Sequence, residues 1–171
     1  MKEQRVLVIV GHPDSQRSQL NRELAETWKA LGQTEVRWIG DAALDVAAEQ
    51  AAVGRADVVV FQFPLYWYGA PACMKRWMDE VLTWGWAFGP DGGLLQGRGL
   101  ACSITVGGRL ADYRAEGKHS TTLDELCKPM ERTAAYVGFE WKGVLGVDRN
   151  RLNELQAENG LAHALESLVS D

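Results

Sequence analysis

The stretch Arg5-Val6-Leu7-Val8-Ile9-Val10-Gly11-His12-Pro13 decides the fold of this 171-residue chain. Its first six residues form a continuous run rich in β-branched side chains, which is typical of a strand covered on both faces of a sheet. Gly11-His12-Pro13 then ends the run, and apolar residues at helical spacing follow over residues 18–31. A buried strand followed directly by a helix favours a parallel α/β architecture.

The alternation of strand and helix continues to the end of the chain. A second buried run, Asp57–Phe63 (DVVVFQF), ends at Pro64. The pattern predicts strands at 5–10, 34–39, 57–63, 99–106 and 141–147, helices at 18–31, 44–54, 72–82, 121–136 and 150–169, and long loops at 85–98 and 109–119. We expect Pro129 to kink the fourth helix. With no linker or repeat, the prediction is one α/β domain over residues 1–171.

Composition and termini exclude several classes of protein. Eighteen Lys and Arg against 23 Asp and Glu give a net charge of −5 without runs of like charge, which argues against nucleic-acid binding. No apolar stretch approaches the roughly 20 residues that span a bilayer, and the N-terminus lacks a signal-peptide pattern. The cysteines are odd in number and widely spaced: Cys73, Cys102 and Cys127. We therefore expect a cytoplasmic protein without disulfides or a metal site.

The order of the strands determines where a ligand would bind. In the order 2-1-3-4-5, the topological switch point lies between strands 1 and 3, beyond their carboxyl ends. The loops 11–18 and 64–70 follow these strands and both have unusual chemistry. The G-x-G-x-x-G fingerprint of the nucleotide-binding order is missing after strand 1. We therefore predict a doubly wound, five-stranded parallel sheet of order 2-1-3-4-5, with helices on both faces.

The first of these loops predicts a phosphate site. A helix N-terminus presents unpaired backbone N–H groups and a positive dipole end. Ser18 can donate its hydroxyl, Asn21 can hold the loop or donate as well, and His12 and Arg17 can add positive charge. Taken alone, Ser18 is also explained as a simple helix N-cap.

The second loop, Pro64-Leu65-Tyr66-Trp67-Tyr68-Gly69-Ala70-Pro71, places three successive aromatic residues between prolines. Such a loop is normally polar, because exposed aromatic surface is unfavourable. A planar aromatic cofactor would provide the partner, with side chains stacked on its ring and backbone N–H groups at its heteroatoms. A core plug or a dimer contact is the alternative for any one of these residues.

The third loop begins with Thr105-Val106-Gly107-Gly108 and continues to Tyr113 and His119. Glycines at a strand end let the backbone approach a ligand, and N–H donors there would favour a reduced flavin, which is negatively charged at its N1/O2 edge. Tyr113 can donate a hydrogen bond, and His119 can exchange a proton near pH 7. The alternatives are a plain Gly-Gly turn and a solvated or helix-capping histidine.

Together these motifs resemble the NAD(P)H:quinone oxidoreductase family of flavodoxin-like flavoproteins. More narrowly, they resemble its short bacterial members, which include ancillary subunits of glutathione-regulated potassium efflux systems. The match also includes Lys75-Arg76-Trp77-Met78-Asp79 and Gly85-Trp86-Ala87-Phe88-Gly89. The family often has Gln at the position of Tyr66 and a second Thr at that of Val106, and we expect both residues to offer their backbone N–H groups instead.

The resemblance implies a site for FMN, with FAD as the alternative, and NAD(P)H as co-substrate. The implied flavin contacts are His12, Ser18, Leu20 and Asn21 at the phosphate arm, Pro64, Leu65, Tyr66, Trp67 and Tyr68 along the ring, and Thr105, Val106, Gly107 and Gly108 at the pyrimidine edge. Tyr113 and His119 are the implied catalytic residues, steadying the charge of hydride transfer. The aromatic loop and residues 84–88 would exclude water.

The implied activity is two-electron reduction of a quinone or similar small acceptor by a homodimer. Two alternatives stay open: a one-electron carrier of the flavodoxin type, and a regulatory subunit that binds the cytoplasmic domain of a potassium efflux transporter. The His-Pro-Asp loop and the mild net charge argue against the carrier, which tends to have a Ser/Thr-rich phosphate loop and a strongly acidic face.

Overall fold

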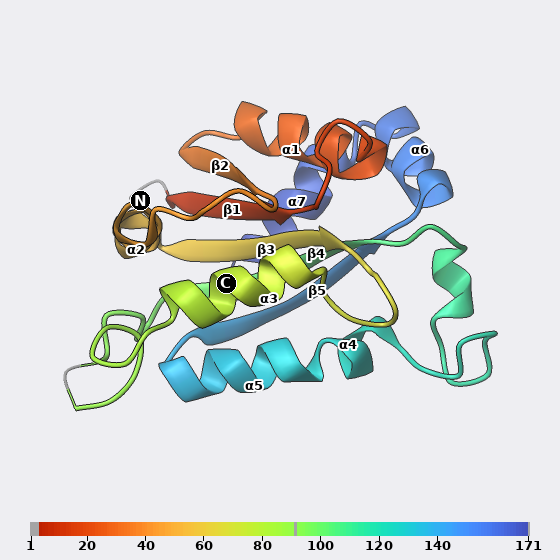
Figure 1. Ribbon diagram of the computed structural model, residues 1–171. Coiled ribbons are helices and arrows are strands. Elements are labelled where there is room, and N and C mark those ends of the chain that lie inside the picture. The colour runs from red at the N-terminus through yellow and green to blue at the C-terminus, as the bar shows by residue number, and fades with distance from the viewer. Residues whose placement is uncertain (1–3, 91, 171) are drawn as a thin grey trace.

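The computed structural model describes residues 4–90 and 92–170, and its sheet has the predicted strand order (Figure 1). The strands are β1 (Val6–Gly11), β2 (Thr34–Ile39), β3 (Val58–Pro64), β4 (Gly99–Thr105) and β5 (Glu140–Val147). They lie in the order β2-β1-β3-β4-β5, and every neighbouring pair is parallel. The switch point between β1 and β3 is therefore confirmed.

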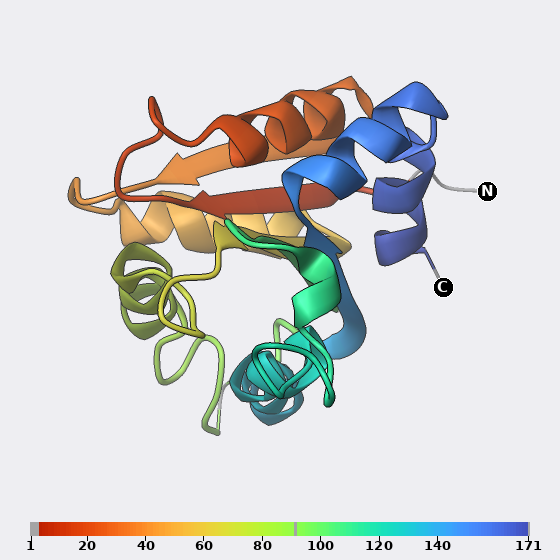
Figure 2. The ribbon, with the colours of Figure 1, turned by 90° about the vertical axis from the view of Figure 1, so that its right-hand side faces the viewer.

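Helices cover both faces of this sheet (Figure 2). They are α1 (Gln19–Ala30), α2 (Val46–Arg55), α3 (Ala72–Val81), α4 (Leu123–Leu126), α5 (Lys128–Val137), α6 (Arg149–Ala157) and α7 (Leu161–Val169), with a short 3-10 turn, η1 (Leu110–Asp112). Buried side chains of α2, α3 and α5 pack on one face, and those of α1, α6 and α7 on the other. None of the described helices is long and apolar enough to cross a membrane.

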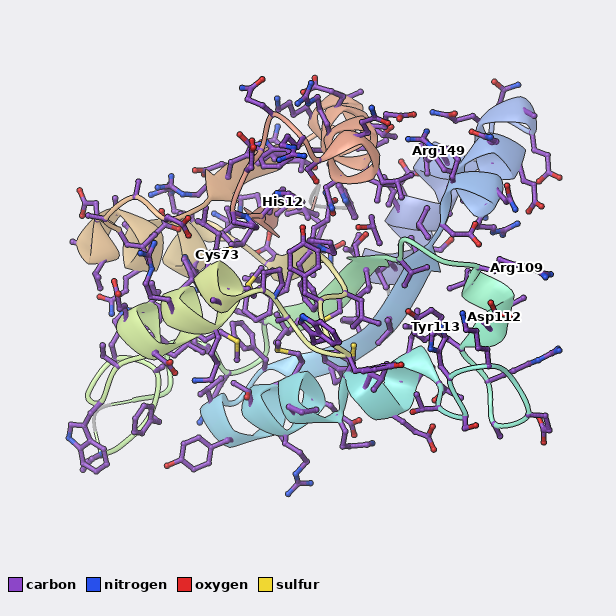
Figure 3. The ribbon with its side chains drawn as sticks, turned by 45° about the vertical axis from the view of Figure 1, so that its right-hand side comes forward. His12, Cys73, Arg109, Asp112, Tyr113 and Arg149 are labelled. Carbon is purple, nitrogen blue, oxygen red and sulfur yellow. The ribbon has the colours of Figure 1, made fainter. Side chains whose placement is uncertain are left out.

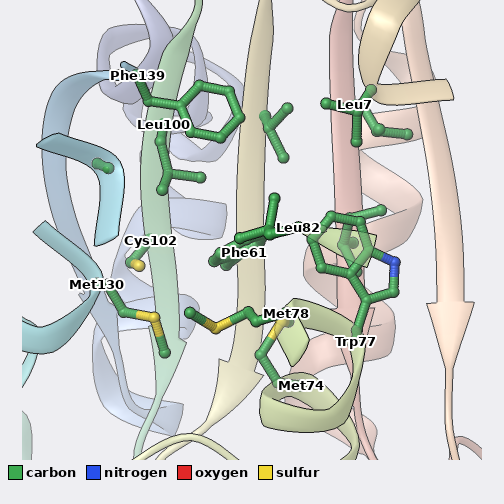
Figure 4. Packing of buried hydrophobic residues seen from close by; sticks show 14 of the residues in the cluster. Leu7, Phe61, Met74, Trp77, Met78, Leu82, Leu100, Cys102, Met130 and Phe139 are labelled. Atoms are coloured by element: carbon green, nitrogen blue, oxygen red, sulfur yellow. The ribbon is translucent and has the colours of Figure 1, made fainter. Parts of the chain in front are cut away.

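Two hydrophobic cores follow from the alternation of side chains along β1. Leu7 and Ile9 point into one core, whereas Val8 and Val10 point into the other, because successive residues of a strand face opposite sides. Trp77 of α3 is the largest side chain in the first core (Figure 4). Burying each such apolar side chain contributes about 1.5–3 kcal/mol, so the continuous apolar runs of the central strands hold the sheet in place.

Two predicted helices are each broken in two. The segment 121–136 divides into α4 and α5 at Cys127, since Pro129 lacks an N–H and is tolerated only in the first turn of a helix. The segment 150–169 divides between α6 and α7, where Asn159 has a φ of +53° and the N–H of Gly160 donates to Leu155 O at 2.7 Å. The prediction of one continuous final helix was wrong, because the Asn-Gly pair closes α6 with a left-handed residue.

The loops after β1, β3 and β4 meet at the carboxyl edge of the sheet, but residues 83–90 and 92–98 do not join them. This segment connects the end of α3 to the start of β4, at the opposite edge (Figure 1). There Trp84 packs edge-on against Phe88, which contacts Tyr136 of α5. Within one copy of the chain, residues 84–88 therefore do not line the site that the motifs predict, contrary to our expectation.

Candidate functional site

A groove of about 410 Å³ opens at the carboxyl edge of the sheet. Its volume lies in the range typical of small-molecule sites. It is lined by Arg17, Ser18, Gln19, Leu20, Asn21, Pro64, Leu65, Tyr66, Thr105, Val106, Gly107 and Arg149. The structure thus brings together residues from the three loops that the sequence singled out, with Arg149 as an addition from α6.

The side-chain amide of Asn21 orients two hydroxyl groups of the groove. Its Nδ2 donates to Ser18 Oγ at 3.1 Å and to Thr105 Oγ1 at 2.9 Å, and all three residues are buried. Each hydroxyl therefore accepts from the amide and keeps its own proton for another acceptor. Ser18 and Thr105 are two oriented donors, and Asn21 serves to hold the loop rather than to donate to a ligand.

Ser18 is not a simple helix cap in this structure. It occupies the N-cap position of α1, yet its side chain accepts from none of the described backbone N–H groups. The hydroxyl is engaged by Asn21 instead. The N-terminal turn of α1 thus keeps its uncapped N–H groups and its positive dipole end at the groove.

A second amide fixes Asn21 itself. Gln62 of β3 is fully buried, and its Nε2 donates to Asn21 O at 2.8 Å. Asn21 Oδ1 is buried with no hydrogen-bond partner among the described residues, so it can accept from a hydroxyl but not from a phosphate oxygen. Our sequence reasoning missed Gln62, although a polar residue inside the run Asp57–Phe63 was an available signal.

His12 contributes no positive charge to the groove. Its Nδ1 accepts from the Asp14 N–H at 3.0 Å, and its Nε2 lies 3.1 Å from Tyr66 Oη. Burial lowers the pKa of His12, against the opposing effect of Asp14, so the neutral form is favoured. The expectation that His12 adds charge was wrong. The cationic side chains that line the groove are Arg17 and Arg149.

Arg149 is the other residue that sequence reasoning missed. It follows β5 directly and begins α6, so the sheet topology brings it to the same edge as the three predicted loops. Its Nη1 bonds Glu23 Oε1 of α1 at 2.7 Å, which steadies the guanidinium beside the N-terminal half of that helix. The available signal was an arginine immediately after the last strand. Figure 3 shows it with His12 and Tyr113.

The aromatic loop is a tight hairpin turn. Tyr66 and Gly69 exchange two backbone hydrogen bonds, and the residues between them, Trp67 and Tyr68, have φ values of +50° and +63°. Positive φ at both central positions is the pattern of a type I′ turn and is strained for aromatic residues. The indole at the tip is 96% exposed, so this turn presents aromatic surface to the outside.

Two backbone donors that we expected to face a ligand are already used. The Tyr66 N–H donates to Gly69 O at 2.9 Å, and the Val106 N–H donates to Val147 O at 3.0 Å. Both expectations were wrong for the same reason, since each residue completes a turn or a strand pair. Gly107 and Gly108 differ, because a Cβ added at either would meet no described atom within 4 Å. These glycines leave open space at the end of β4.

The predicted catalytic residues form a ring cluster with the aromatic loop. His119 stacks on Tyr113 with ring centroids 4.3 Å apart and 22° between the planes. Its Nδ1 lies 3.3 Å from Tyr68 Oη. Burial, then Tyr68 and Asp112, raise the pKa of Tyr113, so its hydroxyl stays protonated at neutral pH. This cluster adjoins the groove through the hairpin turn and does not line it.

Known proteins share this architecture. The family model for the flavodoxin-like fold covers residues 4–170. The chain belongs to this family. A flavodoxin-like relative from Salmonella typhimurium, named glutathione-regulated potassium-efflux system ancillary protein KefF, is 39% identical over 140 residues, which are 80% of this chain and 78% of the relative.

Two solved flavodoxin-like structures cover almost the whole chain. General stress protein 14 from Treponema denticola, in complex with FMN, has a TM-score of 0.84 and 30% identity, with 96% of this chain and 97% of that one covered. The NADPH-quinone reductase from P. pentosaceus has a TM-score of 0.87 and 28% identity, with 98% of each chain covered. The family resemblance drawn from the motifs is confirmed.

Proposed function

We propose that this protein is an FMN-dependent NAD(P)H oxidoreductase that reduces quinones or similar acceptors by two-electron hydride transfer. The observation that carries the proposal is the groove at the switch point, with the hydroxyls of Ser18 and Thr105 oriented by one buried amide. Two similar structures support it: a 30% identical relative binds FMN, and another relative is named an NADPH-quinone reductase.

The residues of the groove fit the parts of a flavin mononucleotide. The N-terminus of α1, the Ser18 hydroxyl and the guanidinium groups of Arg17 and Arg149 suit a phosphate. The unpartnered Asn21 Oδ1 suits a hydroxyl of the ribityl chain. The open space at Gly107 suits a ring edge. The named FMN complex favours FMN over FAD.

In the proposed reaction, the bound flavin supplies hydride acceptance from NAD(P)H and hydride donation to the quinone. The chain's own residues orient it and exclude water. Thr105 would direct its proton to the flavin, and Trp67 would cover the open side of the site. His119, with Nδ1 at the Tyr68 hydroxyl, would hold or exchange a proton at Nε2, next to the neutral Tyr113.

Stopped-flow absorbance of the flavin-loaded protein tests this proposal. NADPH or NADH should bleach the flavin spectrum, and a quinone should restore it without a stable blue semiquinone. If neither nucleotide reduces the loaded protein, the enzyme proposal fails. A long-lived semiquinone after partial reduction would favour the one-electron carrier.

A second role is favoured by the name of the Salmonella relative. We propose that the chain can also act as an ancillary subunit on the cytoplasmic domain of a potassium efflux transporter. Co-purification with such a transporter, and flavin-dependent stimulation of its potassium efflux, would support this role. Sedimentation at micromolar concentration tests the expected homodimer, and a monomer there would contradict it.

A further inference from the structure

The Tyr66 side chain connects two of the loops at the carboxyl edge of the sheet. It extends from the aromatic loop after β3 to His12 in the loop after β1, where the hydroxyl lies 3.1 Å from Nε2. The two rings meet edge-on, with centroids 5.9 Å apart and 67° between the planes.

Hydrogen bonding fixes which nitrogen of His12 carries the proton. The Asp14 backbone N–H donates to Nδ1 at 3.0 Å, so Nδ1 must be unprotonated. His12 is buried, and this burial lowers the pKa of its imidazole from the ordinary value of 6.5, which favours the neutral ring at pH 7. Its single proton then lies on Nε2 and is directed at Tyr66 Oη.

The direction of this bond orients the tyrosine hydroxyl. Tyr66 accepts from His12, so its own proton needs a separate acceptor. Within residues 4–90 and 92–170, this hydroxyl makes no other hydrogen bond. Tyr66 lines the groove together with Ser18 and Asn21, and it is 42% exposed. The acceptor for its proton is therefore outside the described residues: it is solvent, or a ligand bound in the groove that Tyr66 lines.

Resting on the proposed function, we propose that Tyr66 contacts the flavin directly by donating its hydroxyl proton to an acceptor oxygen of the phosphate–ribityl arm. In this arrangement, His12 is a positioning residue that acts through Tyr66, and it does not bind the phosphate as a cation.

Flavin binding by four forms of the full chain tests the proposal. They are the natural chain, Tyr66→Phe, His12→Asn and the double variant, each titrated with FMN and with riboflavin. Asn at position 12 can still accept from the Asp14 N–H, as Nδ1 does, but it cannot reach Tyr66. Tyr136→Phe is the matched control, because Tyr136 is an exposed tyrosine at the opposite edge of the sheet.

We expect Tyr66→Phe to weaken FMN binding about 10- to 100-fold, the loss of one hydrogen bond to a charged group. His12→Asn should cause a smaller loss, and no further loss once Tyr66 is Phe. If Tyr66→Phe weakens the binding of FMN but not of riboflavin, the acceptor is on the phosphate. If it weakens the binding of both flavins equally, the acceptor is a ribityl hydroxyl. In ¹⁵N spectra, His12 should carry its proton on Nε2.

Several results would overturn the inference. If Tyr66→Phe binds both flavins like the natural chain, its hydroxyl donates to neither. His12→Asn could also weaken FMN binding equally in the natural chain and in Tyr66→Phe, or His12 could carry its proton on Nδ1. Either result would show that His12 does not act through Tyr66. If the natural chain binds no flavin, the proposed function fails together with the inference. If the natural chain binds FMN and the variants bind it equally well, the inference fails while the proposed function stands.

Discussion

Two regions at the carboxyl edge of the sheet, which we call the polar wall and the aromatic wall, differ in how tightly their side chains are held. The polar wall, formed by His12, Ser18, Asn21 and Thr105, is buried, and each of its polar side chains makes at least one hydrogen bond within the wall or to its neighbours. The aromatic wall is formed by the turn Tyr66–Gly69, whose three aromatic residues are exposed, and by the half-buried Tyr113–His119 pair beside the groove.

This difference suggests a division of labour. A preorganised polar site loses little entropy on binding and suits a group that stays bound. An open aromatic surface, with rings of several orientations, suits planar substrates that must enter and leave in turn. On this view, changes in the polar wall affect cofactor affinity, whereas changes in the aromatic wall affect turnover.

The largest expected effect is on the aromatic wall. His119→Asn should lower the rate of quinone reduction about 100-fold, since general acid–base groups typically contribute 10²–10⁴-fold, and FMN affinity should stay unchanged. Stopped-flow rates with a flavin-saturated protein measure this. His163→Asn is the control, because His163 is exposed on α7. A matching loss of FMN affinity would break the division between the walls.

The next effect is on the polar wall. Asn21→Leu removes the donor to both hydroxyls and should weaken FMN binding by a factor of about 10 to 100. It should also destabilise the fold by about 1–3 kcal/mol, because it deprives buried polar groups of their partner. Fluorescence titration and urea unfolding measure the two effects. Once flavin is saturating, turnover should approach the natural value; a persistent turnover defect would contradict the assignment.

A smaller effect is expected at the tip of the aromatic loop. Trp67→Asn should leave the free energy of unfolding unchanged or raise it by up to about 1 kcal/mol, because Asn tolerates positive φ better than Trp. The KM for a quinone should rise, since the exposed ring would no longer cover the substrate. A marked loss of stability would indicate that the indole is packed and not displayed.

The smallest effect concerns pH. The pKa of His12 is lower in the folded state than its ordinary value of 6.5, so the unfolded chain binds more protons as the pH falls below about 6.5. The stability that neutral His12 contributes is complete above that pH and is lost as the pH falls through its folded pKa. Urea unfolding between pH 8 and pH 5 should show this loss, and His12→Asn should flatten the profile.

The strand order could be predicted because the buried runs around Val8 and Val60 are unambiguous, and the motifs after them identified the loops at the switch point. The breaks at Cys127 and Asn159 were harder to see. They depend on where Pro129 can be tolerated and on one left-handed residue, whereas helical spacing of apolar residues continues through both segments.

The site could be predicted in its residues but only partly in its chemistry. Sequence motifs indicated Ser18 and Thr105, but the direction of their protons depends on Asn21, whose amide is 84 positions from Thr105 in sequence. The charge state of His12 depends on its burial and on the Asp14 N–H. Arg149 reaches the groove only because β5 ends at the same edge of the sheet.

The account's central claim is that the polar wall is a preorganised site for the phosphate arm of FMN. Calorimetric titration of the flavin-free full chain with FMN and with riboflavin tests this claim most directly. We predict one FMN per chain, bound at least tenfold more tightly than riboflavin, as expected when a charged group gains hydrogen bonds. Equal affinity for the two flavins, or no binding of FMN, would contradict it.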